Sequence, residues 1–346
     1  MIVLVTGAAG FIGSSLVLRL LHDGHQVVGV DNLSSYYDVS LKQARLGRLS
    51  SHPGFVFERL DLAERSSAAR LFGEHRYETV VHLAAQPGVR YSINNPAAYI
   101  DANLVAFGNI LEQTRLAGVP HFLFASSSSV YGANHQLPFS EHDPVDHPVS
   151  LYAATKRANE LLAHSYAHLH RLPCTGLRFF TVYGPWMRPD MAIYKFAEGI
   201  MQGRPIPVHN RGDMLRDFTY IDDIVEGVVR LMAVAPRPDP GWKGDTCDPS
   251  RSSAPFRLYN IGNHQPVELM RVIRLLEQAL GRKAILELLT MQPGEVQATA
   301  ADISGIRAAV GFEPSTPIET GIARFAEWYL DYSSGRPLAR QVIADG

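Results

Sequence analysis

Short apolar runs alternate with segments of helical periodicity through the first half of the chain. The β-rich runs lie at residues 2–6, 26–30, 55–59, 79–84, 121–126 and 175–180. Helical spacing of the apolar positions is found between these runs, in residues 11–22, 64–73, 97–117 and 151–169. Pro148 and Ser150 stand where a stop and an N-cap are expected before the last of these helices. A repeated order of strand, helix and strand predicts a parallel sheet with helices on both faces. The expected fold is therefore an α/β, Rossmann-type doubly wound sheet.

The second half of the chain follows a looser pattern. After residue 181 come Pro-rich connections such as YGPWMRPD, then helical patterns near 221–235 and 266–280. We expect a first domain over residues 1–180, joined by a strand and a helix from about 215–262. A smaller lobe over 181–332 and a tail over 333–346 follow. Residues 236–257 are rich in Pro, Gly and Ser and predict a surface loop.

Composition argues against several classes of function. The 32 Lys and Arg nearly balance the 34 Asp and Glu, and no basic stripe indicates a nucleic-acid partner. No apolar stretch approaches the roughly 18 residues of a membrane span. Cys174 and Cys247 lie far apart, which favours neither a disulfide scaffold nor a zinc site and makes the cytoplasm the expected location. His164 and His168 have a zinc-compatible spacing but no HExxH glutamate, so no metal is expected.

A glycine-rich turn follows the first strand directly. VTGAAGFIG places Gly7, Gly10 and Gly13 at the start of the first helix, where backbone N–H groups and the positive helix end can approach a pyrophosphate. The second strand ends in Asp31, near the spacing at which a carboxylate meets an adenosine ribose. Because Asn32 follows instead of an arginine, NAD is the expected cofactor and not NADP. The alternatives are a plain tight turn and a surface acid.

Further cofactor contacts are expected beyond the glycine turn and Asp31. Asp61 comes just after the third strand and can contact the adenine edge, or can cap the helix that follows. The other expected cofactor contacts are Phe11, Ile12, Asn32, Leu62, Leu83, Ala84, Ala85 and Asn103.

The segment SLYAATKRANEL places Tyr152 and Lys156 four residues apart, on one face of a helix. The pKa of a phenol, ordinarily about 10, must fall by about three units, roughly 4 kcal/mol, for it to act as a base near neutrality. One nearby cation lowers it by about one to three units, so Lys156 and the positive nicotinamide ring together can suffice. Ser127 ends the fifth strand, where its hydroxyl can hold a substrate oxygen. Taken one at a time, each residue has a structural alternative. Tyr152 can be a packed tyrosine, Lys156 a surface lysine, and Ser127 part of a serine-rich loop.

Taken together, these motifs resemble the extended short-chain dehydrogenase/reductase family. The glycine loop, HLAAQPGVRYS, SSSSVYG, YAATK, RDFTYIDD and QPGEV carry the likeness. Within that family, PGVRYSINNP, SEHDPVDHPVSLYAATKRANE, LRFFTVYGPWMRPDMA and YNIGNHQPVELM are similar to UDP-glucuronate 4-epimerases, over residues 1 to about 332. The resemblance implies conversion of UDP-glucuronate to UDP-galacturonate, through a 4-keto sugar and with NAD as the hydride carrier.

The resemblance also implies roles for individual residues. Tyr152 is the expected base, Lys156 its tuner and ribose anchor, and Ser127 the hydroxyl partner. The residues expected to hold UDP are Val208, Arg216 and Glu295, with Arg188 closing over the phosphates. Glu295 departs from the aspartate expected there, and Gln292 in place of arginine fits the glucuronate group best. A surface ion pair with Asp217 is the alternative for Arg216.

The substrate carboxylate poses a separate chemical problem, because a 4-keto uronic acid loses CO₂ readily. The candidates for holding the carboxylate away from the reactive alignment are Arg90, Ser128 and Thr181. Decarboxylases and dehydratases of the family carry an acid just after the catalytic hydroxyl, where this chain has Ser128 and Ser129. The alternatives are a UDP-glucose/UDP-galactose 4-epimerase, a UDP-glucuronate decarboxylase, and a noncatalytic NAD-binding redox sensor.

The helices expected at 97–117 and 151–169 carry wide apolar stripes, LVAFGNILEQTRL and LLAHSYAHL. In the resembled family such helices pair across a two-fold axis, which implies a homodimer. Packing inside one chain is the alternative.

Overall fold

A computed structural model describes residues 1–244, 248–292 and 296–335. Its central sheet has seven parallel strands in the order β11-β6-β5-β4-β1-β2-β3. The strands are β1 (Ile2–Thr6), β2 (Gln26–Asp31), β3 (Phe55–Arg59), β4 (Thr79–His82), β5 (Phe122–Ser127), β6 (Cys174–Phe179) and β11 (Phe256–Ile261). The predicted doubly wound sheet is therefore confirmed. Strand order reverses between β1 and β4, and ligands of such sheets bind at that point.

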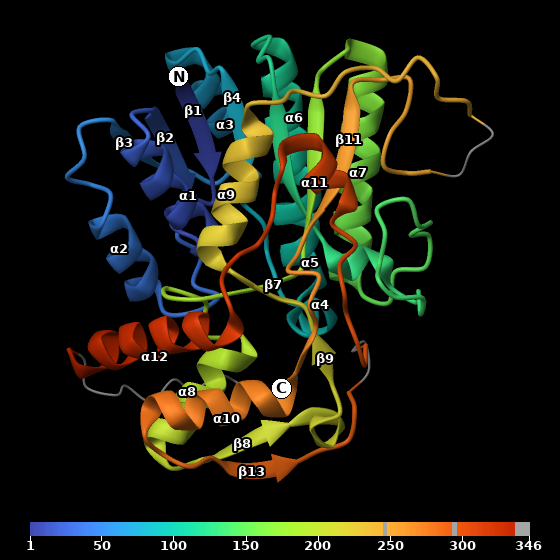
Figure 1. The fold of residues 1–346 in the computed structure, drawn as a ribbon. Helices are drawn as coiled ribbons and strands as arrows, with labels where there is room; N and C mark the ends of the chain where they lie inside the picture. Colours follow the sequence, from blue (N-terminus) through green and yellow to red (C-terminus); the bar gives the residue numbers. More distant parts are fainter. Residues whose placement is uncertain (245–247, 293–295, 336–346) are drawn as a thin grey trace.

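Helices cover both faces of the sheet (Figure 1). One face carries α1 (Phe11–His22), α9 (Ile221–Met232) and α11 (Ser304–Val310), and the other carries α3 (Arg65–Glu74), α6 (Ala106–Leu116) and α7 (Leu151–His170). Neighbouring residues of β1 serve different layers, because Val5 belongs to the core under α1 and Leu4 to the core under α6. Burial on both faces explains why these strands are continuous apolar runs.

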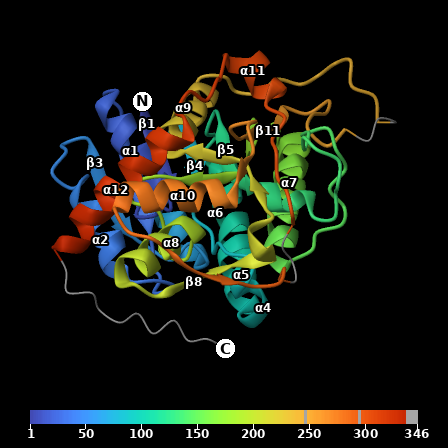
Figure 2. The same cartoon turned by 60° about the horizontal axis from the view of Figure 1, so that its bottom comes forward.

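A smaller group of elements lies below the carboxyl ends of the strands (Figures 1 and 2). Its helices are α8 (Ala192–Gln202), α10 (Leu269–Leu280) and α12 (Ile318–Ser334). Its strand pairs are β8 (Pro205–Val208) with β13 (Ile285–Leu288) and β9 (Leu215–Arg216) with β12 (Val267–Glu268), while β7 (Thr181–Tyr183) pairs with β10 (Phe218–Tyr220) nearer the sheet. One hydrophobic core runs from the α1 face of the sheet into this group. The domain boundaries themselves stay a prediction.

The chain departs from the expected single helix over 97–117. It forms α4 (Tyr91–Asn94), α5 (Pro96–Tyr99), a π-helix at Ile100–Val105, and then α6. The wider π turn contains Asn103, whose Oδ1 accepts from the Gln86 backbone N–H at 2.7 Å and whose Nδ2 donates to the Gln86 carbonyl at 3.1 Å. This irregularity therefore ties the helix to the loop after β4, as π-bulges near functional sites often do.

Two expected helix caps gave different results. Ser150 caps α7 as predicted, since its hydroxyl accepts from the Ala153 backbone N–H at 3.1 Å. Asp61 does not cap α3. Its carboxylate accepts from the Ala63 N–H at 2.9 Å and from Asn32 Nδ2 at 3.2 Å, so it holds the strand-end loops together.

A buried polar network fastens α7 to the sheet. Glu160 accepts from Ser126 Oγ at 2.6 Å and from Arg178 Nε and Nη2 at 2.9 and 3.0 Å. Arg178 Nη1 also donates to Tyr131 Oη at 3.1 Å, and that hydroxyl donates to Asn260 Oδ1 at 2.6 Å. The network thus joins α7 to β5, β6 and β11 directly behind the strand ends.

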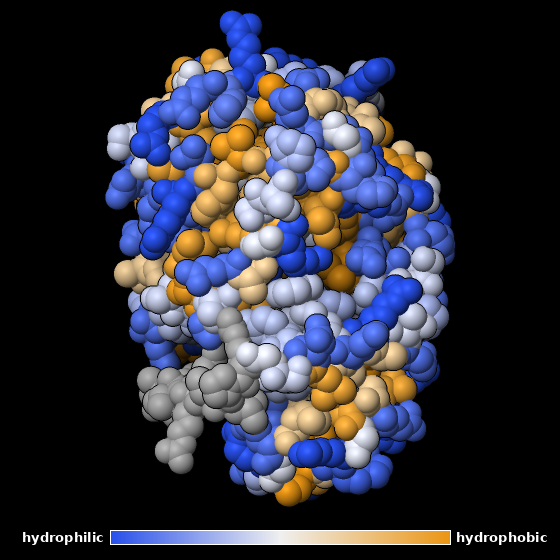
Figure 3. Space-filling view, turned by 90° about the vertical axis from the view of Figure 1, so that its left-hand side faces the viewer, coloured by the Kyte–Doolittle hydropathy of each residue, from blue (hydrophilic) through white to orange (hydrophobic). Residues whose placement is uncertain are grey.

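The surface beside β3 and α2 (Val39–Gly47) intersperses hydrophilic with hydrophobic side chains (Figure 3). Across residues 1–244, 248–292 and 296–335, no helix combines the length and the apolar character needed to cross a membrane.

Candidate active site

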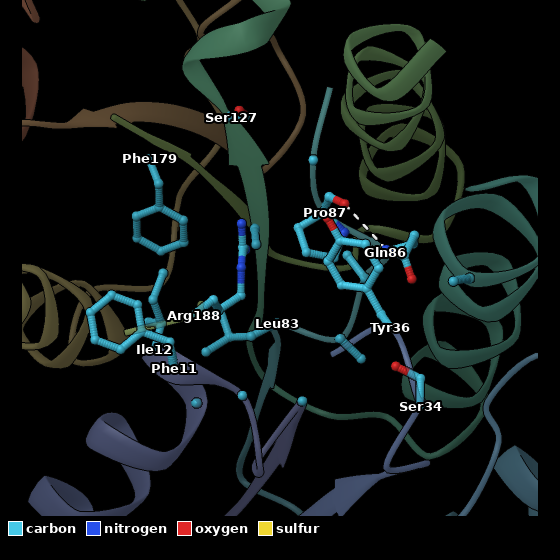
Figure 4. A pocket seen from close by; sticks show the side chains of 18 of the residues that line it. Phe11, Ile12, Ser34, Tyr36, Leu83, Gln86, Pro87, Ser127, Phe179 and Arg188 are labelled. Carbon is cyan, nitrogen blue, oxygen red and sulfur yellow. Dashed lines mark hydrogen bonds between the residues drawn. The ribbon is translucent and has the colours of Figure 1, made fainter. Parts of the chain in front are cut away.

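Two adjoining cavities lie at the carboxyl ends of the strands. The first, about 420 Å³, lies where the strand order reverses and is drawn in Figure 4. The second, about 480 Å³, extends from there toward the lower group of elements. Both are lined by Tyr36, Gly88, Val89, Ser128, Ser129 and Thr181. The two cavities therefore share a wall and can hold two ligands in contact.

The glycine loop leaves no room for side chains at the start of α1. Gly7 has φ +71°, and a Cβ added there would lie 2.9 Å from the Ala84 backbone nitrogen. A Cβ at Gly13 would lie 2.0 Å from the Gly7 carbonyl oxygen. Gly10 is the N-cap and offers no capping side chain, so the first N–H groups of α1 are available to an anion. This geometry fits the pyrophosphate of NAD.

Asp31 is held in place at the other end of the first cavity. Its carboxylate accepts from the backbone N–H groups of Ala9 at 3.3 Å and Leu33 at 2.8 Å. Lys42 Nζ donates to the same carboxylate at 3.3 Å and is itself buried. Lys42 was not predicted, because α2 shows no clear apolar periodicity and a lysine on its own has no distinctive spacing. The pair can present a fixed carboxylate to the adenosine ribose.

Replacing Asp31 with serine is expected to shift cofactor preference toward NADP by about 10- to 100-fold. The substitution removes the charge that repels a 2′-phosphate and releases the Lys42 ammonium to meet that phosphate. Equilibrium titration of NAD-depleted protein with each dinucleotide measures the ratio of affinities. Asp61→Asn is the matched control, because its carboxylate contacts Asn32 and not Lys42. An unchanged ratio in Asp31→Ser would contradict the assigned role of Asp31.

The three predicted reacting groups come together at one side of the first cavity. Lys156 Nζ donates to the Ala125 carbonyl at 3.0 Å, and burial lowers the pKa of Lys156 to about 8. Ser127 donates to Ser129 Oγ at 3.1 Å and accepts from the Ser129 backbone N–H at 3.2 Å. This contact fixes the Ser127 hydroxyl at the end of β5.

Burial raises the pKa of Tyr152 above its ordinary value. The groups that act in the lowering direction are the hydrogen-bonded Ser127 hydroxyl and the Arg188 guanidinium. The sequence predicts that Lys156 lowers this pKa. Lys156 lines the same cavity as Tyr152 and donates one hydrogen bond to the Ala125 carbonyl, and its role as the tuner stays a prediction. A further positive charge in the first cavity is therefore what the phenol still needs to ionise near neutrality, and the nicotinamide ring of NAD⁺ carries such a charge.

Most of the other predicted site residues line the cavities. The first cavity is lined by Phe11, Ile12, Asn32, Asp61, Leu62, Leu83, Ala84, Ala85 and Arg188. The second is lined by Arg90 and Arg216, and both are lined by Ser128 and Thr181. The Asp217 carboxylate accepts from the backbone N–H groups of Asn263, His264 and Ala301, so its role is to hold the loops around Arg216.

Two predicted residues lie elsewhere, and a third cannot be placed. Asn103 does not line the first cavity, because its side chain accepts from the Gln86 backbone N–H and donates to Thr155 Oγ1 behind the cavity wall. Val208 ends β8 with a side chain that is 0% exposed, so it belongs to the hydrophobic core. Glu295 falls outside the described residues.

Sequence reasoning missed three side chains of the cavity walls, Tyr36, Gln86 and Asp190. Asp190 accepts from Arg188 Nε and Nη2 at 3.0 and 3.1 Å, and Tyr36 Oη donates to Asp190 at 3.2 Å. Figure 4 shows Tyr36 beside Gln86 and Pro87, across the cavity from Phe11 and Ile12. The tyrosine pair at 36–37 lies in a polar loop. An aromatic side chain in such a loop was the one feature of the sequence that could have indicated a residue of the cavity wall.

Comparison with known proteins agrees with this geometry. Residues 3–241 match the model of the NAD dependent epimerase/dehydratase family. The chain belongs to this family. A probable UDP-glucuronate 4-epimerase of Rhizobium meliloti (strain 1021) is 50% identical over 330 residues, which cover 94% of this chain and 96% of that protein. UDP-glucuronate 4-epimerase 1 of Arabidopsis thaliana is 47% identical over 335 residues, which cover 95% of this chain and 77% of that protein.

A solved structure of another epimerase has the same overall architecture. UDP-glucuronic acid 4-epimerase from Bacillus cereus, in complex with UDP-glucuronic acid and NAD, matches with a TM-score of 0.85 and 31% identity. The match covers 96% of this chain and 100% of that one. The expected α/β fold, family and cofactor are therefore confirmed for this epimerase-family chain.

Proposed function

We propose that this protein is an NAD-dependent UDP-glucuronate 4-epimerase, which interconverts UDP-glucuronate and UDP-galacturonate. The observation that carries the proposal is the meeting of Tyr152, Lys156 and Ser127 at one side of the first cavity, where the adjacent Ser128 also lines the second cavity. One cavity has the glycine loop and Asp31 of a dinucleotide site. The other is lined by arginines suited to an anionic sugar nucleotide.

NAD, when bound, supplies the hydride acceptor and donor at sugar C4. The Tyr152 phenolate accepts the proton of the 4-hydroxyl, and the resulting phenol returns a proton to O4 once the sugar has turned over. The Ser127 hydroxyl turns its proton from Ser129 Oγ to O4, which holds O4 beside Tyr152, and still accepts from the Ser129 backbone N–H. The UDP moiety, gripped by Arg216 and Arg188, retains the intermediate while the sugar moves.

The substrate carboxylate is proposed to be held by Ser128, Thr181 and Arg90. These side chains line the second cavity, next to Ser127. Loss of CO₂ requires the breaking carbon–carbon bond to align with the carbonyl π system, so a pinned carboxylate is protected. Positions 128 and 129 carry serine, and no carboxyl group is available there to assist elimination or decarboxylation.

Incubation with UDP-glucuronate tests the proposal directly. The expected result is an equilibrium mixture with UDP-galacturonate, no release of CO₂ and no net reduction of NAD. UDP-xylose with CO₂ would identify a decarboxylase instead. A preference for UDP-glucose would identify a UDP-glucose/UDP-galactose 4-epimerase, and a lack of turnover of either sugar would leave the redox-sensor alternative.

We also propose a cytoplasmic homodimer that pairs through α6 and α7. Leu116 on α6 and Leu161 and Leu169 on α7 are 59%, 56% and 70% exposed, so both helices present apolar side chains outward. Sedimentation equilibrium is expected to give twice the chain mass. Leu161→Glu is expected to shift the protein toward monomer, whereas Ile285→Glu, at an exposed position of β13, should leave a dimer. A monomeric unsubstituted protein would rule this interface out.

A further inference from the structure

The loop after β2 lines the first cavity and reaches the second cavity at Tyr36. It begins beside Asp31, and Tyr36 Oη near its tip donates to Asp190 Oδ2 at 3.2 Å. Asp190 lies in the connection between β7 and α8, 154 residues away along the chain. This contact therefore joins the cofactor side of the site to the substrate side.

Asp190 is a strong acceptor in a fixed position. Arg188 donates to both of its carboxylate oxygens, at 3.0 and 3.1 Å, and this pairing lowers the pKa of Asp190. The carboxylate is therefore ionised at neutral pH, and hydrogen bonds to ionised acceptors are stronger than neutral ones.

The ring of Tyr36 is held as firmly as its hydroxyl. It packs against Tyr91 with ring centroids 4.7 Å apart. Gly88 has φ +99°, and a Cβ there would come within 2.9 Å of Tyr36 Oη. The glycine at this position thus permits the close approach of the loop after β4 to the tyrosine. Tyr36 and Gly88 line both cavities, so they stand where the cofactor and the substrate would meet.

We propose that Tyr36 and Asp190 form a clasp that holds the loop after β2 over the bound NAD and slows its release. The loop starts at the residue expected to contact the adenosine ribose, lines the first cavity through Ser34 and Tyr36, and is tethered at Asp190, so in this proposal the cofactor leaves past it. Outward movement of the loop breaks the bond between Tyr36 and Asp190. Tyr36 is accordingly a cofactor-retaining residue, while Tyr152 and Lys156 are the reacting ones.

Slow release of NAD suits a 4-epimerase, and the biological purpose of the clasp rests on that proposed function. A 4-epimerase oxidises and re-reduces the same sugar, so loss of the reduced cofactor midway would strand a keto intermediate. Retention of NAD is nevertheless measurable without any sugar nucleotide. Failure of the clasp and failure of the epimerase assignment can therefore be told apart.

The decisive measurement is the rate at which NAD leaves the purified holoprotein. The protein is diluted into an enzyme that consumes free NAD, and the loss of bound cofactor is followed over time. Tyr36→Phe, which removes only the hydroxyl, is expected to release NAD about tenfold faster. Tyr91→Phe is the matched control, because Tyr91 contacts the same ring without bonding Asp190, and its release rate is expected to equal that of the unsubstituted protein.

Asp190→Ala and the double variant with Tyr36→Phe complete the test. Asp190→Ala removes the acceptor of the Tyr36 bond together with the pair to Arg188, so adding Tyr36→Phe to it should release NAD no faster than Asp190→Ala alone, which is the non-additivity of a directly coupled pair. An unchanged release rate in Tyr36→Phe overturns the proposal. Fully additive effects, or equal acceleration in Tyr91→Phe, would also overturn it, since they indicate general loosening of the loop.

Discussion

Replacing Tyr152 with phenylalanine is expected to lower kcat for epimerisation by about 10²- to 10⁴-fold, the usual contribution of a positioned acid or base. The ring keeps its packing against Tyr99, with centroids 6.1 Å apart, so the shape of the cavity is preserved. Only the proton carrier at O4 is lost. The affinity for UDP should change little, because the phenylalanine ring leaves the guanidinium groups proposed to bind the diphosphate, Arg188 and Arg216, in place.

Steady-state turnover and calorimetric binding of UDP, measured on the same preparation, separate these two effects. The matched control is Tyr166→Phe, on the same helix but with its ring beside His170 and far from the cavities. The control is expected to retain activity within about twofold. Turnover of Tyr152→Phe within tenfold of the unsubstituted protein would remove Tyr152 from the role of base.

Replacing Arg178 with methionine is expected to destabilise the folded protein by about 3–5 kcal/mol, the cost of breaking a buried ion pair. The Glu160 carboxylate would remain buried with its bidentate partner gone, and Arg157, whose Nη1 donates to Glu160 at 3.1 Å, would be the cation left beside it. The Arg178 guanidinium holds the pKa of Glu160 below its ordinary value, so the carboxylate is charged at neutral pH and cannot easily escape the penalty by taking up a proton. The melting temperature, measured at fixed NAD concentration because bound ligand adds stability, should fall by several degrees.

Two variants distinguish loss of the buried pair from loss of an arginine as such. Arg271 pairs with Glu319 at the surface, and Arg271→Met is expected to cost at most about 1 kcal/mol. Glu160→Gln combined with Arg178→Met removes both charges and should recover part of the stability lost in Arg178→Met alone. If Arg178→Met melts as the surface control does, the network does not hold α7 to the sheet.

The buried network of Glu160 and Arg178 also lies next to the reacting groups. Glu160 stands one helical turn beyond Lys156, and its partner Ser126 directly precedes Ser127. The ion pair therefore sets how α7, with its tyrosine and lysine, sits against the strand that carries the serine. Loss of the pair is expected to affect catalysis as well as stability.

The sequence by itself determined the features that depend on neighbours close along the chain. Alternation of apolar runs and helical patterns predicted a parallel sheet with helices on both faces, because strands buried on both faces are apolar throughout. Glycines between β1 and α1, Asp31 at the end of β2, the Ser150 cap and the spacing of Tyr152 and Lys156 are all local geometry. Each could be assigned before any contact between distant segments was known.

The tertiary structure alone decided which distant side chains meet. Lys42 reaches Asp31 from a helix without clear periodicity, Tyr36 meets Asp190, and Arg178 meets Glu160. Asn103 and Val208 point away from the first cavity, because the π turn and the β8 register turn them toward a loop and the hydrophobic core. A hydrogen bond forms within about 3 Å, whereas residues 36 and 190 have no relation along the chain. Only the packing of the sheet against the lower group of elements brings such partners within that distance.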